Sequence, residues 1–139
     1  MKTKKKHVGL TKDAGWQFGL RKTFPYSLEY LWNFMFSKEG VSIWLGELSE
    51  ELELKKTCQT KDGIEGFVRV FTPLSHIRMN WKKNHWQNTS IVQVRVIGNN
   101  EKATISFHQE KLLNYNQREE MKLYWNNKMA EIENVLTGR

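Results

Sequence analysis

The sequence is poor in residues that mark special chemistry or special environments. Its 139 residues include one cysteine and two prolines. The single Cys58 cannot form an intramolecular disulfide, which is typical of a reducing compartment. No apolar run approaches the roughly 20 residues that a membrane-spanning helix needs, and the basic start lacks the apolar stretch of a secretory signal. We therefore expect a soluble cytoplasmic protein.

Familiar catalytic, cofactor and metal motifs are also missing from the sequence. No phosphate-binding loop, dinucleotide glycine pattern or nucleophile elbow is present, and the four histidines lack metal-ligand spacing. Cys58 has no recognisable catalytic partners, so we interpret it as a small strand residue. His108 and Glu110 share one face of a predicted strand, opposite Phe107, and we interpret them as a solvated pair. We expect no enzymatic activity, no cofactor and no metal.

Positive charge is concentrated at the start of the chain. The net charge is +7, and residues 1–15 hold five lysines against one aspartate. We expect residues 1–14 to form a basic flexible tail and residues 15–139 to form a single domain, a normal size for one hydrophobic core. The tail has no aromatic residue before Trp16, so we interpret it as solubilising and do not expect a nucleic-acid partner.

Apolar periodicity predicts an α+β protein. Alternating patterns predict strands over residues 16–24, 52–61, 64–72, 75–83, 90–97 and from Glu101 onward. Asp62-Gly63 is typical of a two-residue hairpin turn. Helical spacing predicts helices from Leu28 to Met35 after a Ser27 cap, through residues 41–45 after an interruption at 37–40, and over 117–136 with Asn116 and Glu119 as its cap. We expect an antiparallel sheet of about six strands curved around the long C-terminal helix.

One strand presents a conflict in its alternation. Phe67 and Phe71 share a face with Arg69, whereas Val68 and Val70 share the other. If the valines face the core, two phenylalanines lie outside and form a self-association patch. A bulge or sheet edge that changes the alternation is the other interpretation.

Several packing and turn segments resemble one known fold family. They are residues 23–27 leading to Leu31-Trp32, residues 44–46, the Asp62-Gly63 hairpin, the strand through Trp81, and residues 107–110 followed by Met121 and Trp125. From about Gly15 to Leu136 the chain resembles the helix-grip superfamily (START, birch-pollen-allergen-like, SRPBCC). It looks most like bacterial homologues of the activator of the ninety-kilodalton heat-shock chaperone ATPase. The resemblance implies a mostly apolar cavity between the sheet and the terminal helix. Nothing matches the additional N-terminal domain of the eukaryotic activator, which contributes heavily to chaperone binding.

Large apolar residues fall at the positions that this fold would point inward. The cavity-lining candidates are Trp32, Met35, Trp44, Met79, Trp81, Val92, Val94, Phe107, Met121, Trp125 and Met129. Flexible methionines and aromatic rings suit a ligand pocket, although the same residues can fill a solid core.

Three hypotheses for function follow. The first is a non-enzymatic protein that binds a small apolar or amphipathic ligand in that cavity. The second is a protein–protein interaction module, such as a homodimer or a chaperone partner, that uses an exposed apolar patch and the basic tail. The third is a cyclase-like enzyme on the same fold, which would need a polar pair inside the cavity.

Overall fold

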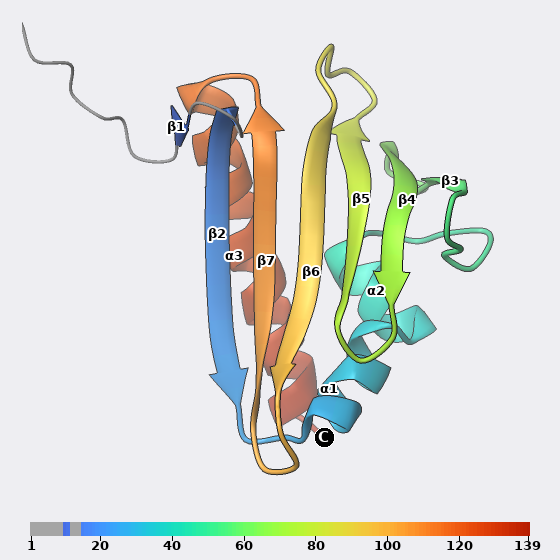
Figure 1. Ribbon diagram of the computed structural model, residues 1–139, viewed down its shortest axis with the longest axis vertical. Helices are drawn as coiled ribbons and strands as arrows, with labels where there is room; N and C mark the ends of the chain where they lie inside the picture. Colours follow the sequence, from blue (N-terminus) through green and yellow to red (C-terminus); the bar gives the residue numbers. More distant parts are fainter. Residues whose placement is uncertain (1–9, 12–14) are drawn as a thin grey trace, which may run out of the picture.

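The computed structural model describes residues 10–11 and 15–139, which form a seven-stranded antiparallel sheet and three α-helices (Figure 1). The strands are β1 (Leu10–Thr11), β2 (Gly15–Phe24), β3 (Thr57–Gln59), β4 (Ile64–Thr72), β5 (His76–Lys83), β6 (Ser90–Gly98) and β7 (Ala103–Leu112). The helices are α1 (Leu28–Met35), α2 (Lys38–Trp44) and α3 (Tyr115–Thr137). The strand order across the sheet is β1-β2-β7-β6-β5-β4-β3. The predicted α+β architecture is confirmed, with two-residue β1 added to the expected strands.

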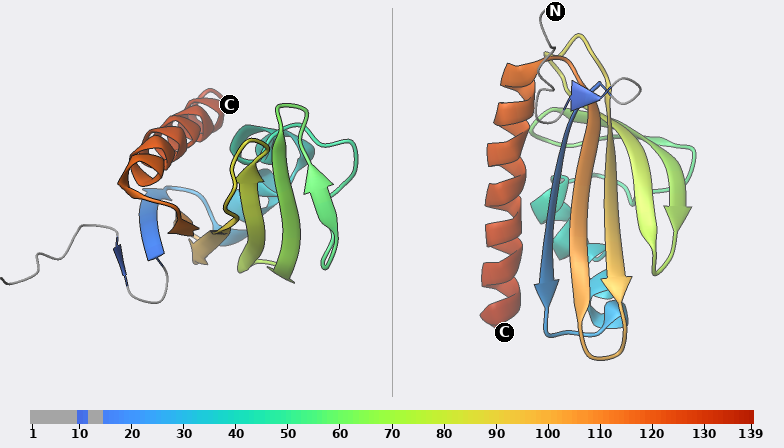
Figure 2. Two further views of the ribbon diagram at one scale, coloured as in Figure 1. Left: turned by 90° about the horizontal axis from the view of Figure 1, so that it is seen from above. Right: turned by 60° about the vertical axis from the view of Figure 1, so that its left-hand side comes forward.

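All three helices lie on one face of a curved sheet (Figure 2). The helix α3 packs along β2 and β7, while α1 packs on β6 and β7 and α2 packs beside α3. We call the helix-covered face concave and the opposite face convex. Burying one face against helices explains why apolar and polar residues alternate along most strands.

The predicted basic tail falls mostly on residues 1–9 and 12–14, which lie outside the described residues. The described pair Leu10–Thr11 bonds to Trp16 and Gly15 of β2 in antiparallel register. The expectation of a flexible tail therefore stays a prediction.

The first two helices begin at serine caps. The Ser27 side chain accepts a hydrogen bond from the Tyr30 backbone N–H at 3.1 Å, as predicted. The Ser37 side chain accepts one from the Gly40 N–H at 3.1 Å, so α2 begins at Lys38, and the predicted later start is wrong. Gly40 lies within α2, and glycine is required there because a Cβ would lie 1.9 Å from the Phe34 carbonyl oxygen. The sequence signal for an interruption was a signal for close helix packing.

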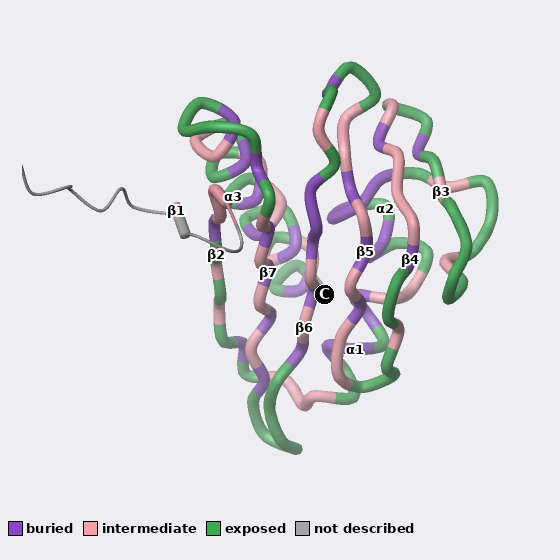
Figure 3. The backbone as a smooth tube through the Cα atoms, turned by 45° about the horizontal axis from the view of Figure 1, so that its top comes forward, coloured by how far each residue is buried: buried purple, intermediate pink, exposed green. Residues whose placement is uncertain are grey.

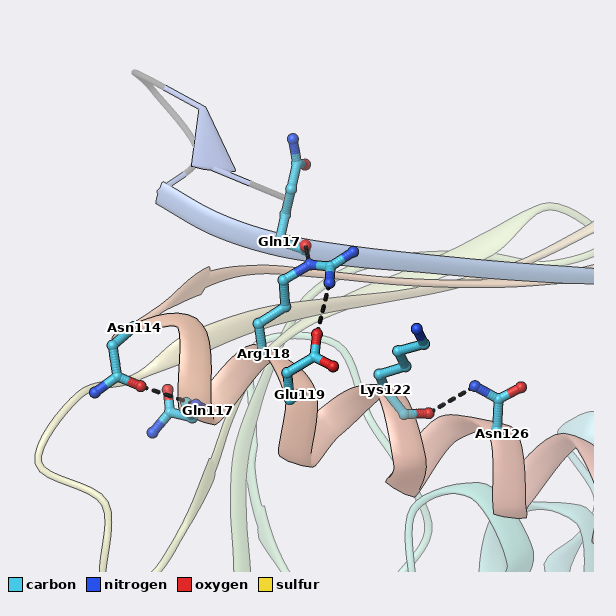
Figure 4. Close-up of polar contacts among 7 residues, drawn as sticks. All are labelled: Gln17, Asn114, Gln117, Arg118, Glu119, Lys122 and Asn126. Carbon is cyan, nitrogen blue, oxygen red and sulfur yellow. Dashed lines mark hydrogen bonds and ion pairs between the residues drawn. The ribbon is translucent and has the colours of Figure 1, made fainter. Parts of the chain in front are cut away.

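The long helix begins earlier than predicted. Asn114 caps it by accepting a hydrogen bond from the Gln117 backbone N–H at 2.8 Å (Figure 4). The Gln117 side chain in turn accepts one from the Leu113 N–H at 2.8 Å. This reciprocal arrangement of Asn114 and Gln117, which lie three residues apart, resembles a capping box. Asn116 and Glu119 are therefore not the cap.

The hairpin of β3 and β4 differs from its predicted form. β3 has three residues, and the preceding Lys55 has a φ of +64°, which interrupts the extended conformation predicted for residues 52–61. Glu65 pairs with Gln59, and the Thr60 N–H donates to the Ile64 carbonyl at 2.9 Å. The loop therefore has three residues (61–63), with a φ of +95° at Gly63. A three-residue hairpin with glycine in the left-handed region replaces the predicted two-residue turn.

A bulge in β4 resolves the conflict around the phenylalanines. Val68 pairs with Met79, and Val70 pairs with Arg78, the neighbour of Met79 in β5. Two residues of β4 thus correspond to one step in β5, so the register shifts at Arg69. Val68 is buried, whereas Val70 is exposed on the other face. After the bulge Phe71 turns to the helices, with its ring centroid 5.4 Å from that of Phe36. The bulge interpretation is therefore correct for Phe71.

The turn before β7 extends two residues further than predicted. The Asn99 side chain accepts hydrogen bonds from the backbone N–H groups of Glu101 and Lys102, at 2.9 and 3.1 Å. These bonds hold both residues in the turn, so the strand begins at Ala103 rather than at Glu101.

The core lies between the concave face and the helices (Figure 3). The inward stripe of α3 consists of Met121, Trp125, Met129, Ile132 and Leu136, each at most 5% exposed. The inward positions of Met121, Trp125 and Met129 agree with the sequence prediction. Lys128, which lies beside the stripe, is only half-buried.

Candidate functional site

An aromatic cluster lies under α3 at the centre of the concave face. Trp81 of β5 is its middle, with ring centroids of Trp86, Tyr124 and Trp125 at 5.3, 5.6 and 6.2 Å. The Phe107 ring stacks on Trp125 at 4.7 Å. Trp86 lies in the loop between β5 and β6 and is only 6% exposed, so its ring folds back onto the sheet. The cluster lies in the region where the sequence predicted the ligand site.

A chain of buried hydrogen bonds crosses the same region. The Trp125 indole N–H donates to the Gln109 side chain at 2.8 Å, and the Gln109 amide donates to the Ser90 hydroxyl at 2.9 Å. The Ser90 hydroxyl then donates to the Trp81 carbonyl at 2.6 Å. Both Gln109 and Ser90 are 0% exposed, so these bonds satisfy polar groups that water does not reach.

Two other polar atoms of the cluster take no part in this series of hydrogen bonds. Among the described residues, the Trp81 Nε1 and the Tyr124 hydroxyl are buried atoms without a hydrogen-bond partner. The other two fully buried tryptophans do have one, because the Trp44 indole donates to the Met35 carbonyl at 2.8 Å and that of Trp125 donates to Gln109. An unpaired buried donor costs about 1–3 kcal/mol of stability. Such an atom needs an explanation, and a bound molecule is one.

Charged groups surround the outer side of Tyr124. Lys128 and Lys83 place their ammonium groups 5.0 and 5.5 Å from its ring centroid, and Lys83 also pairs with Glu120 at 2.6 Å. Burial raises the pKa of Tyr124 far above its usual value, and the negative charge of Asp62 raises it further. The hydroxyl therefore stays protonated and can donate.

All eleven predicted cavity-lining residues are buried. Trp81, Phe107 and Trp125 meet in the aromatic cluster. Trp32 and Trp44 instead pack around Phe36 under α1 and α2, with ring centroids 4.1 and 5.8 Å from it. Their role as ligand-lining residues stays a prediction.

Sequence reasoning missed four residues of this region: Ser90, Gln109, Trp86 and Tyr124. Gln109 continues the inward alternation of Ala103, Ile105 and Phe107, so a polar residue at a core position was a usable signal. Ser90 likewise precedes inward Val92 in β6. Trp86 and Tyr124 carried no such signal, since one lies in a loop and the other beside the apolar stripe.

An open cleft lies elsewhere, at the β3 edge of the sheet. Its volume is about 370 Å³, and none of the predicted residues lines it. Its lining includes four glutamates (Glu50, Glu51, Glu53 and Glu65) and the Cys58 thiol. Burial raises the pKa of Cys58, which keeps the thiol protonated and supports its interpretation as a strand residue.

The pair on the convex face is less solvated than predicted. Glu110 forms an ion pair with Arg78 across β6, and its side chain is only 14% exposed. The His108 Nε2 lies 2.9 Å from the Gln17 side-chain oxygen. Burial lowers the pKa of His108; the Glu110 charge opposes this shift and the Arg78 charge adds to it. His108 and Glu110 thus belong to a polar cluster on the outer surface of the sheet.

The first turns of α3 are fastened to the sheet (Figure 4). The Arg118 Nε donates to the Gln17 carbonyl of β2 at 2.7 Å, and its guanidinium lies 5.5 Å from the Phe18 ring centroid. Gln117 and Asn88 exchange side-chain hydrogen bonds at 2.8 and 3.1 Å. These contacts fix the loop that carries Trp86 against the start of the helix.

The chemistry available under α3 is hydrogen bonding rather than proton transfer. In the described part of the chain, the buried polar residues are Thr60, Ser90, Gln109 and Gln117. Hydroxyl and amide groups are not acids or bases near neutral pH, so this geometry gives no support to a cyclase-like reaction. Over residues 10–11 and 15–139, no three His, Cys, Asp or Glu side chains are grouped as a metal site would require. No described helix has the length and apolarity to cross a membrane.

The sheet that curves around a long C-terminal helix, with two short helices after the first long strand, is the helix-grip fold. DynU16, a protein from the dynemicin biosynthetic locus, matches with a TM-score of 0.77 and 15% identity, over 88% of this chain and 48% of its own. An HSP90 activator from Plasmodium falciparum matches with a TM-score of 0.72 and 17% identity, over 88% of this chain and 96% of its own. The Aha1 dimer from Colwellia psychrerythraea gives 0.71 and 11%, over 86% and 95%.

These likenesses support the predicted resemblance at the level of the fold. The chain spans about half the length of DynU16. No protein-family profile and no curated protein matches the sequence. The functional conclusion therefore depends on the residues of the site itself.

Proposed function

We propose that this chain is a non-enzymatic binding protein that holds a small apolar or amphipathic molecule between the sheet and α3. The observation that carries the proposal is the pair of unpartnered buried atoms, Trp81 Nε1 and Tyr124 Oη, in the aromatic cluster. The indoles of the other two fully buried tryptophans, Trp44 and Trp125, are hydrogen-bonded within the protein, so the Trp81 N–H and the Tyr124 hydroxyl are the donors that a bound molecule could accept from.

The surroundings suit the apolar part of such a molecule. Met79, Met121 and Met129 lie on the concave face and on α3, and their unbranched side chains can change rotamer to admit a ligand. Trp86 covers Trp81 from the loop between β5 and β6, so its ring would form one wall of the site. Of the predicted lining residues, those of the aromatic cluster and the methionines beside them would form its walls: Met79, Trp81, Phe107, Met121, Trp125 and Met129.

Native mass spectrometry of the protein purified from its own source tests this proposal. We expect a bound organic mass that is released on denaturation. Protein prepared without the ligand should bind apolar probes with a change in tryptophan fluorescence. A protein that carries no mass and binds no apolar probe would contradict the proposal.

A protein–protein role is the second candidate. Two structures of the same fold are an HSP90 activator and an Aha1 dimer. Near the start of α3 this chain exposes three apolar side chains, Leu113, Tyr115 and Leu123, each more than half exposed. Sedimentation tests self-association, and an ATPase assay with purified HSP90 tests activation. A monomer that leaves the ATPase rate unchanged would exclude both forms of this role.

A further inference from the structure

We infer that the Trp81 indole N–H and the Tyr124 hydroxyl hold the uncharged carbonyl oxygen of the ligand. This inference rests on the proposed binding function and adds the chemical class of the bound molecule. It begins from two polar atoms that lie on rings in edge contact, with centroids 5.6 Å apart at an angle of 69°.

The hydrogen-bonding capacities of the two side chains select the partner. An indole N–H can only donate, and a protonated phenol donates one hydrogen bond. A carbonyl oxygen accepts two, so one such group can satisfy both donors. Trp81 is 0% exposed, so bulk water does not compete for its N–H.

The charges around the site favour a neutral oxygen over a carboxylate. An anion under α3 would need a cation in direct contact, because an unpaired buried charge is very costly. Lys83 is already paired with Glu120, and Lys128 lies over the face of the Tyr124 ring rather than at its hydroxyl. Asp62 is near enough for its negative charge to act on the Tyr124 hydroxyl, and it would repel an anion there.

Three probes of equal chain length test the chemical class: methyl nonyl ketone, undecane and undecanoate. The readout is heteronuclear NMR of the indole N–H groups, of which the six tryptophans supply six. The Trp81 signal is assigned by its loss in Trp81→Phe. We expect the ketone to bind more tightly than the hydrocarbon and the carboxylate, and to move the Trp81 signal downfield.

Tyr124→Phe tests the second donor. We expect it to weaken ketone binding about five-fold, the value of one ordinary hydrogen bond, and to leave undecane binding unchanged. The matched control is Tyr30→Phe, which removes the hydroxyl of an exposed tyrosine on α1. The control should bind all three probes like the unchanged protein.

The outcomes separate this inference from the proposed function. If no probe binds, the proposed function itself fails. If undecane or undecanoate binds as tightly as the ketone, or if Tyr124→Phe has no effect, binding stands and the carbonyl assignment is wrong. A Trp81 N–H signal that contacts a long-lived internal water in the ketone complex would also overturn the assignment.

Discussion

Tyr124 and Trp125 are consecutive residues of α3, and both rings contact Trp81, yet their polar atoms differ. The Trp125 indole begins a hydrogen-bonded chain through Gln109 and Ser90 that ends on the Trp81 carbonyl. The Tyr124 hydroxyl and the Trp81 Nε1 have no partner among the described residues. The first set stabilises the folded protein, whereas the second set costs stability until something binds it. The difference separates the polar groups that the fold needs from those that remain for a ligand.

Of the substitutions that we predict, Gln109→Leu has the largest effect on stability. It removes two buried hydrogen bonds and leaves the Trp125 N–H unpaired, so the free energy of unfolding should fall by about 2–3 kcal/mol. Urea denaturation measures it. The control is Gln93→Leu on the convex face of β6, which should change stability by less than about 0.5 kcal/mol. Equal effects of the two substitutions would contradict the structural role of the buried hydrogen bonds made by Gln109.

Ser90→Ala should have a smaller effect in the same direction. The Ser90 hydroxyl accepts from Gln109 and donates to the Trp81 carbonyl, so its loss should cost about 1–2 kcal/mol. Thermal or urea unfolding against Ser106→Ala, a half-buried serine of β7, provides the comparison. If Ser90→Ala leaves the free energy of unfolding unchanged, the stabilising hydrogen bonds do not extend beyond Gln109 to Ser90.

Two tyrosines test the contrast between hydrogen-bonded and unpartnered polar groups, with an expected difference in stability of about 1 kcal/mol. The Tyr26 hydroxyl donates to the Leu136 carbonyl at 3.2 Å, so Tyr26→Phe should destabilise the protein by about 0.5–1.5 kcal/mol. Tyr124→Phe removes an unpartnered hydroxyl, so the ligand-free protein should be equally stable or more stable. If Tyr124→Phe destabilises as much as Tyr26→Phe, the Tyr124 hydroxyl has a partner in the free protein.

The smallest predicted effect is the contribution of His108, on the convex face, to the pH dependence of stability. The folded protein lowers the pKa of His108 below its usual 6.5, mainly by burial, so the unfolded chain binds a proton more readily. The free energy of unfolding should therefore fall as the pH decreases from 7 toward about 5.5. His108→Gln should reduce this slope without abolishing it, because His76 is shifted in the same direction. Identical slopes in urea titrations would show that His108 contributes nothing.

The sequence predicted the regular elements and the buried faces well, because periodicity reports directly on burial. It identified the Ser27 cap, the inward stripe of α3 and the inward positions of β6 and β7. It offered a bulge as one of two interpretations of residues 67–71 but could not decide between them, and it did not predict the positive φ of Lys55, because both features depend on how neighbouring strands pair. It also could not predict the contrast between Tyr124 and Trp125, because the partner of a buried polar atom is set by three-dimensional contacts between distant segments.

A crystal structure of the protein with methyl nonyl ketone tests the central claim most directly. The account predicts the carbonyl oxygen about 3 Å from both Trp81 Nε1 and Tyr124 Oη, with the alkyl chain among the methionines under α3. Ketone found instead in the cleft of about 370 Å³ at the β3 edge, with the core under α3 unchanged, would contradict it.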